Sequence, residues 1–72
     1  MITIQTVLVS IEGAWNKSRN TGNFISGEIG ILEEQVELGN VRIVRENGSN
    51  WAQLTDSGRS FLYHLNSTNK NV

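Results

Sequence analysis

The apolar residues at the start of the chain fit two different secondary structures. Within Ile2–Ile11, the residues Ile4, Leu8 and Ile11 recur at the three- and four-residue spacing of a helix face. The same segment is rich in Val, Ile and Thr, whose branched side chains favour strands. We predict a strand here, and the choice between strand and helix stays open for residues 2–14.

A second apolar segment, Phe24–Leu32, follows a polar loop at residues 15–23. Its apolar positions include Ile25, Ile29 and Ile31. We predict a second strand here, in which Gly27 and Gly30 indicate curvature or a close approach of another backbone.

The residues after Gln35 predict a three-stranded meander. An extra residue at Gly39-Asn40 is typical of a β-bulge. Asn47-Gly48 fits the two positive-φ positions of a type I′ hairpin turn. A second turn at Asp56-Ser57-Gly58 leads into a third strand at Arg59–Leu65.

The predicted strand pairing also assigns each side chain of the hairpin to one of its two faces. Loops of two or of four residues give the same grouping, whereas a three-residue loop would scramble it. One face, expected to be core, holds Val41, Ile43, Ala52 and Leu54. The other face holds Arg42, Val44, Trp51 and Gln53.

We therefore predict a mostly β fold, a small five-stranded bent sheet or partly open barrel with a C-terminal β-meander. Seven Ile, six Val and five Thr against two Ala favour strands over helices. The chain is short enough for one domain, predicted at residues 1–65. The polar residues 66–72 are predicted to be a disordered tail.

Residues Trp51–Leu65 support an alternative fold. They resemble the end of the wing in winged-helix DNA-binding domains, where a strand runs into a Leu-Thr-x-x-Gly-Arg motif that opens a helix; here the motif begins at Leu54. The resemblance covers about fifteen residues. It implies a compact α+β winged helix, with the wing at about 41–55, an N-cap at Thr55 and a helix from 56, and it leaves residues 56–65 open between strand and helix. It also implies a role as a DNA-binding transcriptional regulator. A winged-helix domain needs three helices before the wing, however, and too few residues precede the hairpin to form them.

Composition excludes several classes of function. The chain has no cysteine and one histidine, His64, so disulfides, thiolate metal sites and thiol catalysis are excluded and an ordinary metal site is not expected. The net charge of −1 gives no overall attraction to nucleic acid or to anionic membranes. We expect a cytoplasmic protein that does not bind membranes, because the apolar start of the chain is too short to span a bilayer and has no basic flank.

The candidate chemistry points to recognition rather than catalysis. His64 and the serines around Asp56 form no nucleophile motif, and Glu33-Glu34 is predicted to be a solvated acidic turn. Arg42, Val44, Trp51 and Gln53 form a candidate binding platform, in which an aromatic side chain is edged by a guanidinium. Trp15, Arg19 and Tyr63 are candidates to extend it. We therefore expect a non-catalytic interaction module without metal or cofactor. Its expected partner is a protein or a second copy of the chain, and nucleic acid is the alternative.

Overall fold

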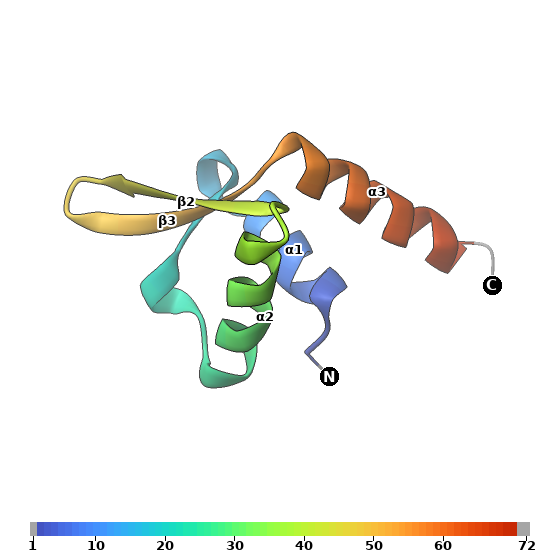
Figure 1. Cartoon of the computed structure of the whole chain (residues 1–72), viewed down its shortest axis with the longest axis horizontal. Coiled ribbons are helices and arrows are strands. Elements are labelled where there is room, and N and C mark those ends of the chain that lie inside the picture. Colours follow the sequence, from blue (N-terminus) through green and yellow to red (C-terminus); the bar gives the residue numbers. More distant parts are fainter. Residues whose placement is uncertain (1, 71–72) are drawn as a thin grey trace.

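The computed structural model describes residues 2–70, with the backbone alone at 68–70, and it shows an α+β arrangement. The elements are α1 (Ile4–Glu12), β1 (Ser18–Asn20), α2 (Ser26–Glu37), β2 (Val41–Glu46), β3 (Ser49–Leu54) and α3 (Asp56–Lys70), with short 3-10 turns η1 (Trp15–Lys17) and η2 (Thr21–Asn23) on either side of β1. The three strands form one antiparallel sheet in the order β1-β3-β2. The β2–β3 hairpin and α3 extend in opposite directions from the centre of the molecule, where α1 and α2 lie (Figure 1).

The prediction of a mostly β, five-stranded sheet or barrel is wrong. Three segments predicted as strands are the helices α1, α2 and α3, and the sheet is open with three strands in the described residues. The alternative expectation was right about the hairpin at about 41–55 and the helix from 56. Before the hairpin, however, the described residues form two α-helices, α1 and α2, rather than the three that a winged-helix domain needs.

Helix α1 forms where a strand was predicted. Its side chains Val7, Leu8 and Ile11 have no exposed surface, so the helical spacing of the apolar residues reflects the core. Burying such a side chain contributes about 1.5–3 kcal/mol, whereas a β-branched residue costs a helix at most about 0.7 kcal/mol. The helix begins with a capping box in which Thr6 N–H donates to Thr3 Oγ1 (3.2 Å) and Thr3 N–H donates to Thr6 Oγ1 (2.8 Å).

Helix α2 and its C-terminal end lie where three features were predicted. These are the strand at Phe24–Leu32, the acidic turn at Glu33-Glu34 and the bulge at Gly39-Asn40. It ends in a Schellman motif, in which Gly39 takes φ of 85° and Asn40 N–H donates to Gln35 O (2.9 Å). A glycine that permits positive φ is typical of both a bulge and a helix end, which is why Gly39 was misinterpreted. Glu33-Glu34 lies within the helix instead of in a turn.

The hairpin prediction is confirmed. Asn47 (φ 52°) and Gly48 (φ 78°) both take the left-handed conformation that a type I′ turn requires. Glu46 pairs with Ser49, so the loop has two residues and the predicted grouping of faces holds.

Helix α3 occupies the segment predicted as a third hairpin strand. Gly58 N–H donates to Thr55 Oγ1 (3.0 Å), so Thr55 is the N-cap that the winged-helix resemblance implies. Leu62 is buried, and Phe61 and Leu65 are half-buried against the core. The helix runs to Lys70 and so includes the backbone of most of the predicted tail, of which residues 71–72 lie outside the described residues.

The core lies between the two helices α1 and α2 and one face of the sheet. It joins α1 to Phe24, to Leu32 of α2 and to Leu62 of α3. The sheet contributes Val41, Ala52 and Leu54, each at most 2% exposed. Ile43, which was expected in the core with them, keeps 42% of its surface exposed.

Gly58 should be the glycine most sensitive to substitution, because a Cβ there would overlap the carbonyl oxygen of Asn40. That oxygen also accepts the N–H of Thr55 at 3.0 Å, so it cannot move freely. We expect Gly58→Ala to lower the free energy of unfolding by about 1–3 kcal/mol, as overpacking does. Urea unfolding followed by circular dichroism measures the change.

Gly30→Ala is the matched control. A Cβ at Gly30 meets nothing within 4 Å, and the residue lies inside α2. We expect it to raise the free energy of unfolding by about 0.5–1 kcal/mol. Equal losses in both variants would contradict this account of the contact between Gly58 and Asn40.

Candidate functional site

The four residues of the predicted platform lie on one face of the sheet. Arg42 pairs with Gln53, and Val44 pairs with Trp51. Because side chains alternate along a strand, all four point away from the face that carries Ala52 and Leu54. We call the surface formed by Arg42, Val44, Trp51 and Gln53 the outer face.

Hydrogen bonds across the strands orient the outer face. Arg42 Nε donates to Gln53 Oε1 (3.2 Å), and Gln53 Nε2 donates to Ser18 Oγ on β1 (2.7 Å). Trp51 Nε1 donates to the carbonyl oxygen of Glu46 (3.2 Å). The guanidinium of Arg42 is therefore fixed beside Gln53, and the indole of Trp51 is turned towards the tip of the hairpin.

Trp15 lies next to the outer face and is the most exposed of the large apolar residues that the structure describes. Its side chain keeps 93% of its surface exposed. It begins η1, where Asn16 (φ 59°) and Lys17 (φ 55°) both take the left-handed conformation. That conformation costs about 1–2 kcal/mol per residue, although Asn tolerates it better than most. The chain thus accepts local strain where it exposes a tryptophan, a combination that often marks a functional surface.

A small open hollow lies between Trp15 and the outer face. Its volume is about 160 Å³. Both tryptophans of the chain line it, together with the polar residues Asn16, Ser18, Glu46, Asn47 and Gln53. We call it the tryptophan hollow. Three residues were considered as extensions of the platform. Trp15 lines the tryptophan hollow, whereas Arg19 and Tyr63 do not.

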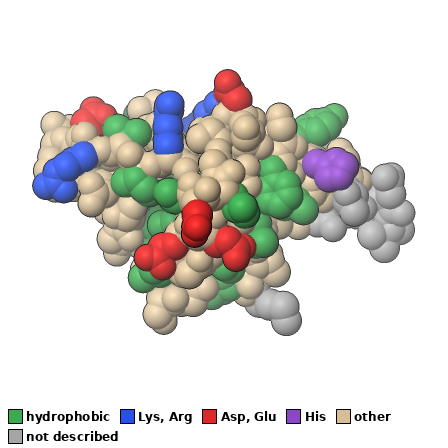
Figure 2. All heavy atoms as spheres, viewed as in Figure 1, with side chains coloured by type: hydrophobic (Ala, Val, Ile, Leu, Met, Phe, Trp, Pro, Cys, Tyr) green, Lys and Arg blue, Asp and Glu red, His purple; other side chains and the backbone are tan. Residues whose placement is uncertain are grey.

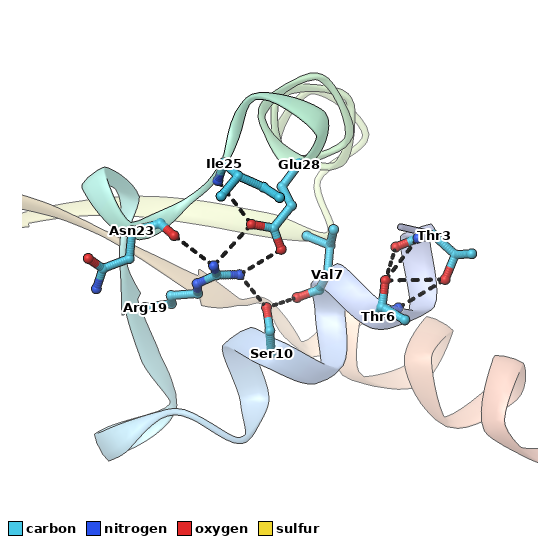
Figure 3. A network of polar contacts seen from close by, with 8 residues as sticks. All are labelled: Thr3, Thr6, Val7, Ser10, Arg19, Asn23, Ile25 and Glu28. Atoms are coloured by element: carbon cyan, nitrogen blue, oxygen red, sulfur yellow. Dashed lines mark hydrogen bonds and ion pairs between the residues drawn. The ribbon is translucent and has the colours of Figure 1, made fainter. Parts of the chain in front are cut away.

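Arg19 is at the centre of a polar network that the sequence reasoning missed. Its two terminal nitrogens each donate to one oxygen of Glu28 (3.0 Å), while Nη1 also donates to Ser10 Oγ (2.7 Å) and Nη2 to Asn23 O (2.8 Å), as Figure 3 shows. The guanidinium carbon lies 4.0 Å from the centre of the Phe24 ring. Nine residues separate Arg19 from Ser10 on one side and from Glu28 on the other, and no local pattern linked them.

This network holds the carboxylate of Glu28 in its charged form. The hydrogen bond from Arg19 lowers the pKa of Glu28 below its ordinary value, and the N–H of Ile25 (3.0 Å) lowers it further. Glu28 is therefore held ionised, with both oxygens engaged and its side chain only 14% exposed. A carboxylate fixed in this way supports the fold and is poorly placed to act as a general base.

A second surface lies between α2 and β2. It is an open groove of about 360 Å³, whose apolar lining is Ile29, Leu32, Val36 and Ile43. Glu33 lines it too, and Glu34 and Glu37 are exposed on the same helix. Acidic side chains gather on this side of the molecule, and Lys and Arg side chains lie towards the hairpin (Figure 2).

Groups for metal binding do not come together in the described residues. No three His, Asp or Glu side chains within residues 2–67 are placed to hold a metal ion. His64 lies on the exposed side of α3, and it does not line the tryptophan hollow. None of the described helices combines the length and the apolar character needed to cross a membrane.

Comparisons of the chain with models of protein families, with curated proteins and with solved structures found no match. The site must therefore be interpreted from its own residues.

Acid should weaken the contribution of Glu28 to stability. Its pKa is lower in the folded protein than the ordinary value of 4.5, so the stabilisation is complete above that value and is lost as the pH falls through the folded pKa. At neutral pH, we expect the free energy of unfolding of the wild-type protein to exceed that of Glu28→Gln by about 1.5–3 kcal/mol, the contribution of a hydrogen bond to a charged group. The difference should shrink below pH 4.5. Urea unfolding at a series of pH values measures it.

Glu34→Gln is a suitable control, because Glu34 is an exposed residue of the same helix. It should leave the stability at neutral pH nearly unchanged. A difference between wild type and Glu28→Gln that does not vary with pH would contradict the assigned role of Glu28.

Proposed function

We propose that the protein is a non-catalytic recognition module that binds a protein partner through the outer face and the tryptophan hollow. The observation that carries the proposal is the exposure of Trp15, at 93% of its surface, beside the half-buried Trp51. Tryptophan is enriched among the residues that dominate binding energy in protein interfaces. Aromatic residues and Arg are likewise enriched at such surfaces, and Arg42 borders this one.

The arrangement around Trp15 supports binding rather than stability. A side chain that is almost fully exposed gains little free energy from packing. Burial of Trp15 therefore does not offset the strain of the turn that presents it. The outer face also carries a row of fixed side chains, from Arg42 through Gln53 to Ser18. Side chains that are already ordered lose less entropy when a partner binds.

The distribution of charge favours a protein over nucleic acid as the partner. Helix α2 precedes the hairpin, the position of the helix that enters the major groove in winged-helix domains. Its exposed charged side chains are Glu33, Glu34 and Glu37, which would face the phosphates of a duplex. Because phosphate neutralisation by Lys and Arg supplies most of the non-specific affinity for DNA, this helix is poorly suited to the role. Self-association and a cytoplasmic location stay predictions from the sequence.

Trp15→Ala should weaken partner binding without unfolding the protein. The side chain is exposed, so the free energy of unfolding should change by less than about 0.5 kcal/mol. Partner affinity should fall by more than about tenfold, the loss expected when an interface hot spot is removed. Affinity capture with wild type and variant, followed by calorimetry on the purified partner, measures the change.

Tyr63→Ala is the matched control, because Tyr63 is also an exposed aromatic residue, at 75%, but lies on α3. It should capture the same partner as wild type. A partner that binds Trp15→Ala as tightly as wild type would contradict the proposal.

Nucleic-acid binding is the second candidate function. The observation that favours it is the order of elements, with a two-stranded hairpin that follows α2 and leads directly into α3. The hairpin carries Arg42 and Arg45, both exposed, and Lys17 is exposed beside β1. In this case the hairpin rather than α2 would contact the phosphates.

A duplex-binding assay distinguishes the two candidates. We expect no binding of a fluorescent DNA duplex at about 0.15 M salt, because few basic side chains lie on any one surface. Fluorescence anisotropy at rising salt concentration measures it. Binding that weakens steeply with salt and is lost in the double variant Arg42→Ala, Arg45→Ala would favour the second candidate over the first.

A further inference from the structure

We infer that the tryptophan hollow binds a cation: the ammonium or guanidinium group of a Lys or Arg side chain on the partner polypeptide. The inference rests on the proposed function and names the chemistry that this site recognises. Three features carry it: the charge of the lining, the two indole rings, and the size of the hollow.

Glu46 gives the hollow a negative charge. It alone among the lining residues has an acidic or basic side chain. Strand alternation places its side chain on the same side of β2 as Val44, and therefore on the side of Trp51. Among the described residues, no ion pair involves its carboxylate, whereas Glu12 and Glu28 are paired with arginines.

The nearby basic residues do not cancel this charge within the hollow. Arg42 lies on the outer face, but its Nε donates to Gln53 and it does not line the hollow. Lys17 follows Asn16 in the chain and does not line it either. The one ionisable side chain that lines the hollow is therefore a carboxylate, which favours a cation over an anion.

The two tryptophans supply the attraction that singles out a cation from other small groups. The face of an indole ring carries negative charge density and binds ammonium or guanidinium groups within about 6 Å of its centre, more strongly than other aromatic rings do. Trp51 is held in place by its hydrogen bond to Glu46 O (3.2 Å), and Trp15 is exposed on the other side. Asn16 and Asn47 also line the hollow, and their amide oxygens can accept hydrogen bonds from a cation.

The size of the hollow fits a side-chain head group. Its volume of about 160 Å³ is equivalent to roughly five water molecules at about 30 Å³ each. Pockets for whole small-molecule ligands are larger, typically about 300–1,000 Å³. A head group on a flexible aliphatic stem can enter the hollow while the rest of the polypeptide lies along the outer face.

Nuclear magnetic resonance of the indole N–H groups tests the inference directly. The chain has two tryptophans and both line the hollow, so both indole signals report on it. The probes are blocked pentapeptides Gly-Ser-X-Ser-Gly in which X is lysine, arginine or norleucine, and inorganic phosphate at matched ionic strength. We expect saturable shifts with the lysine or arginine peptide, and about four- to twentyfold weaker binding of norleucine, which lacks the charge that an indole face and a carboxylate attract.

Glu46→Gln tests the carboxylate. It should weaken the lysine or arginine peptide by about two- to fivefold, the effect of one partly exposed ion pair, and should leave norleucine unchanged. Glu33→Gln removes the same charge from α2, away from the tryptophan hollow, and should have no effect. Should Glu46→Gln fail to fold, the comparison of lysine with norleucine in the wild-type protein still decides the question.

Each other outcome overturns the inference. Equal binding of norleucine would show an apolar site, and shifts with phosphate alone would show an anion site. If no probe shifts the indole signals while Trp15→Ala still loses its partner, the hollow recognises another group and the proposed function stands. If Trp15→Ala also keeps its partner, the proposed function fails as well.

Discussion

The bidentate ion pair between Arg19 and Glu28 joins three parts of the chain that the hydrophobic core alone would hold less firmly. Both oxygens of Glu28 accept from the guanidinium, which also binds Ser10 of α1 and the backbone of Asn23. The side chains of the pair are only 18% and 14% exposed, so each charge depends on the other for its solvation. Strand β1 has only three residues, and this network fixes it between α1 and α2.

The position of Arg19 in β1 also determines what the outer face can present. Arg19 pairs with Ala52 and points to the helices, so its neighbour Ser18 points the other way and accepts a hydrogen bond from Gln53. Trp15 lies three residues before Ser18, and the left-handed turn at Asn16 and Lys17 connects them. The network on the inner side and the tryptophan hollow on the outer side are therefore set by the same short strand. A change that frees β1 should disturb both.

The sequence predicted those parts of the fold whose signals are local. Asn47-Gly48 fixed the hairpin turn, and the period of two then grouped Arg42 with Trp51 correctly. The N-terminal segment was misassigned because its β-branched residues favour a strand. The helix forms nevertheless, because it buries Val7, Leu8 and Ile11 in the core. The capping pair Thr3 and Thr6 was the overlooked signal. The position of Trp15 beside Trp51 and the contacts of Arg19 depend on the tertiary fold, and no spacing in the sequence encodes them.

In this small chain the core and the proposed binding surface consist of different residues. A domain of 72 residues has little core to spare, and here nearly every buried side chain belongs to the helices or to the inner face of the sheet. Trp15 and Glu46 are exposed, so substitutions there should change the tryptophan hollow while the packing of Ala52 and Leu54 stays intact. Trp51 is the exception, because it is half-buried and hydrogen-bonded to the hairpin backbone. Its substitution would mix binding with stability, which makes Trp15 the cleaner position at which to separate the two.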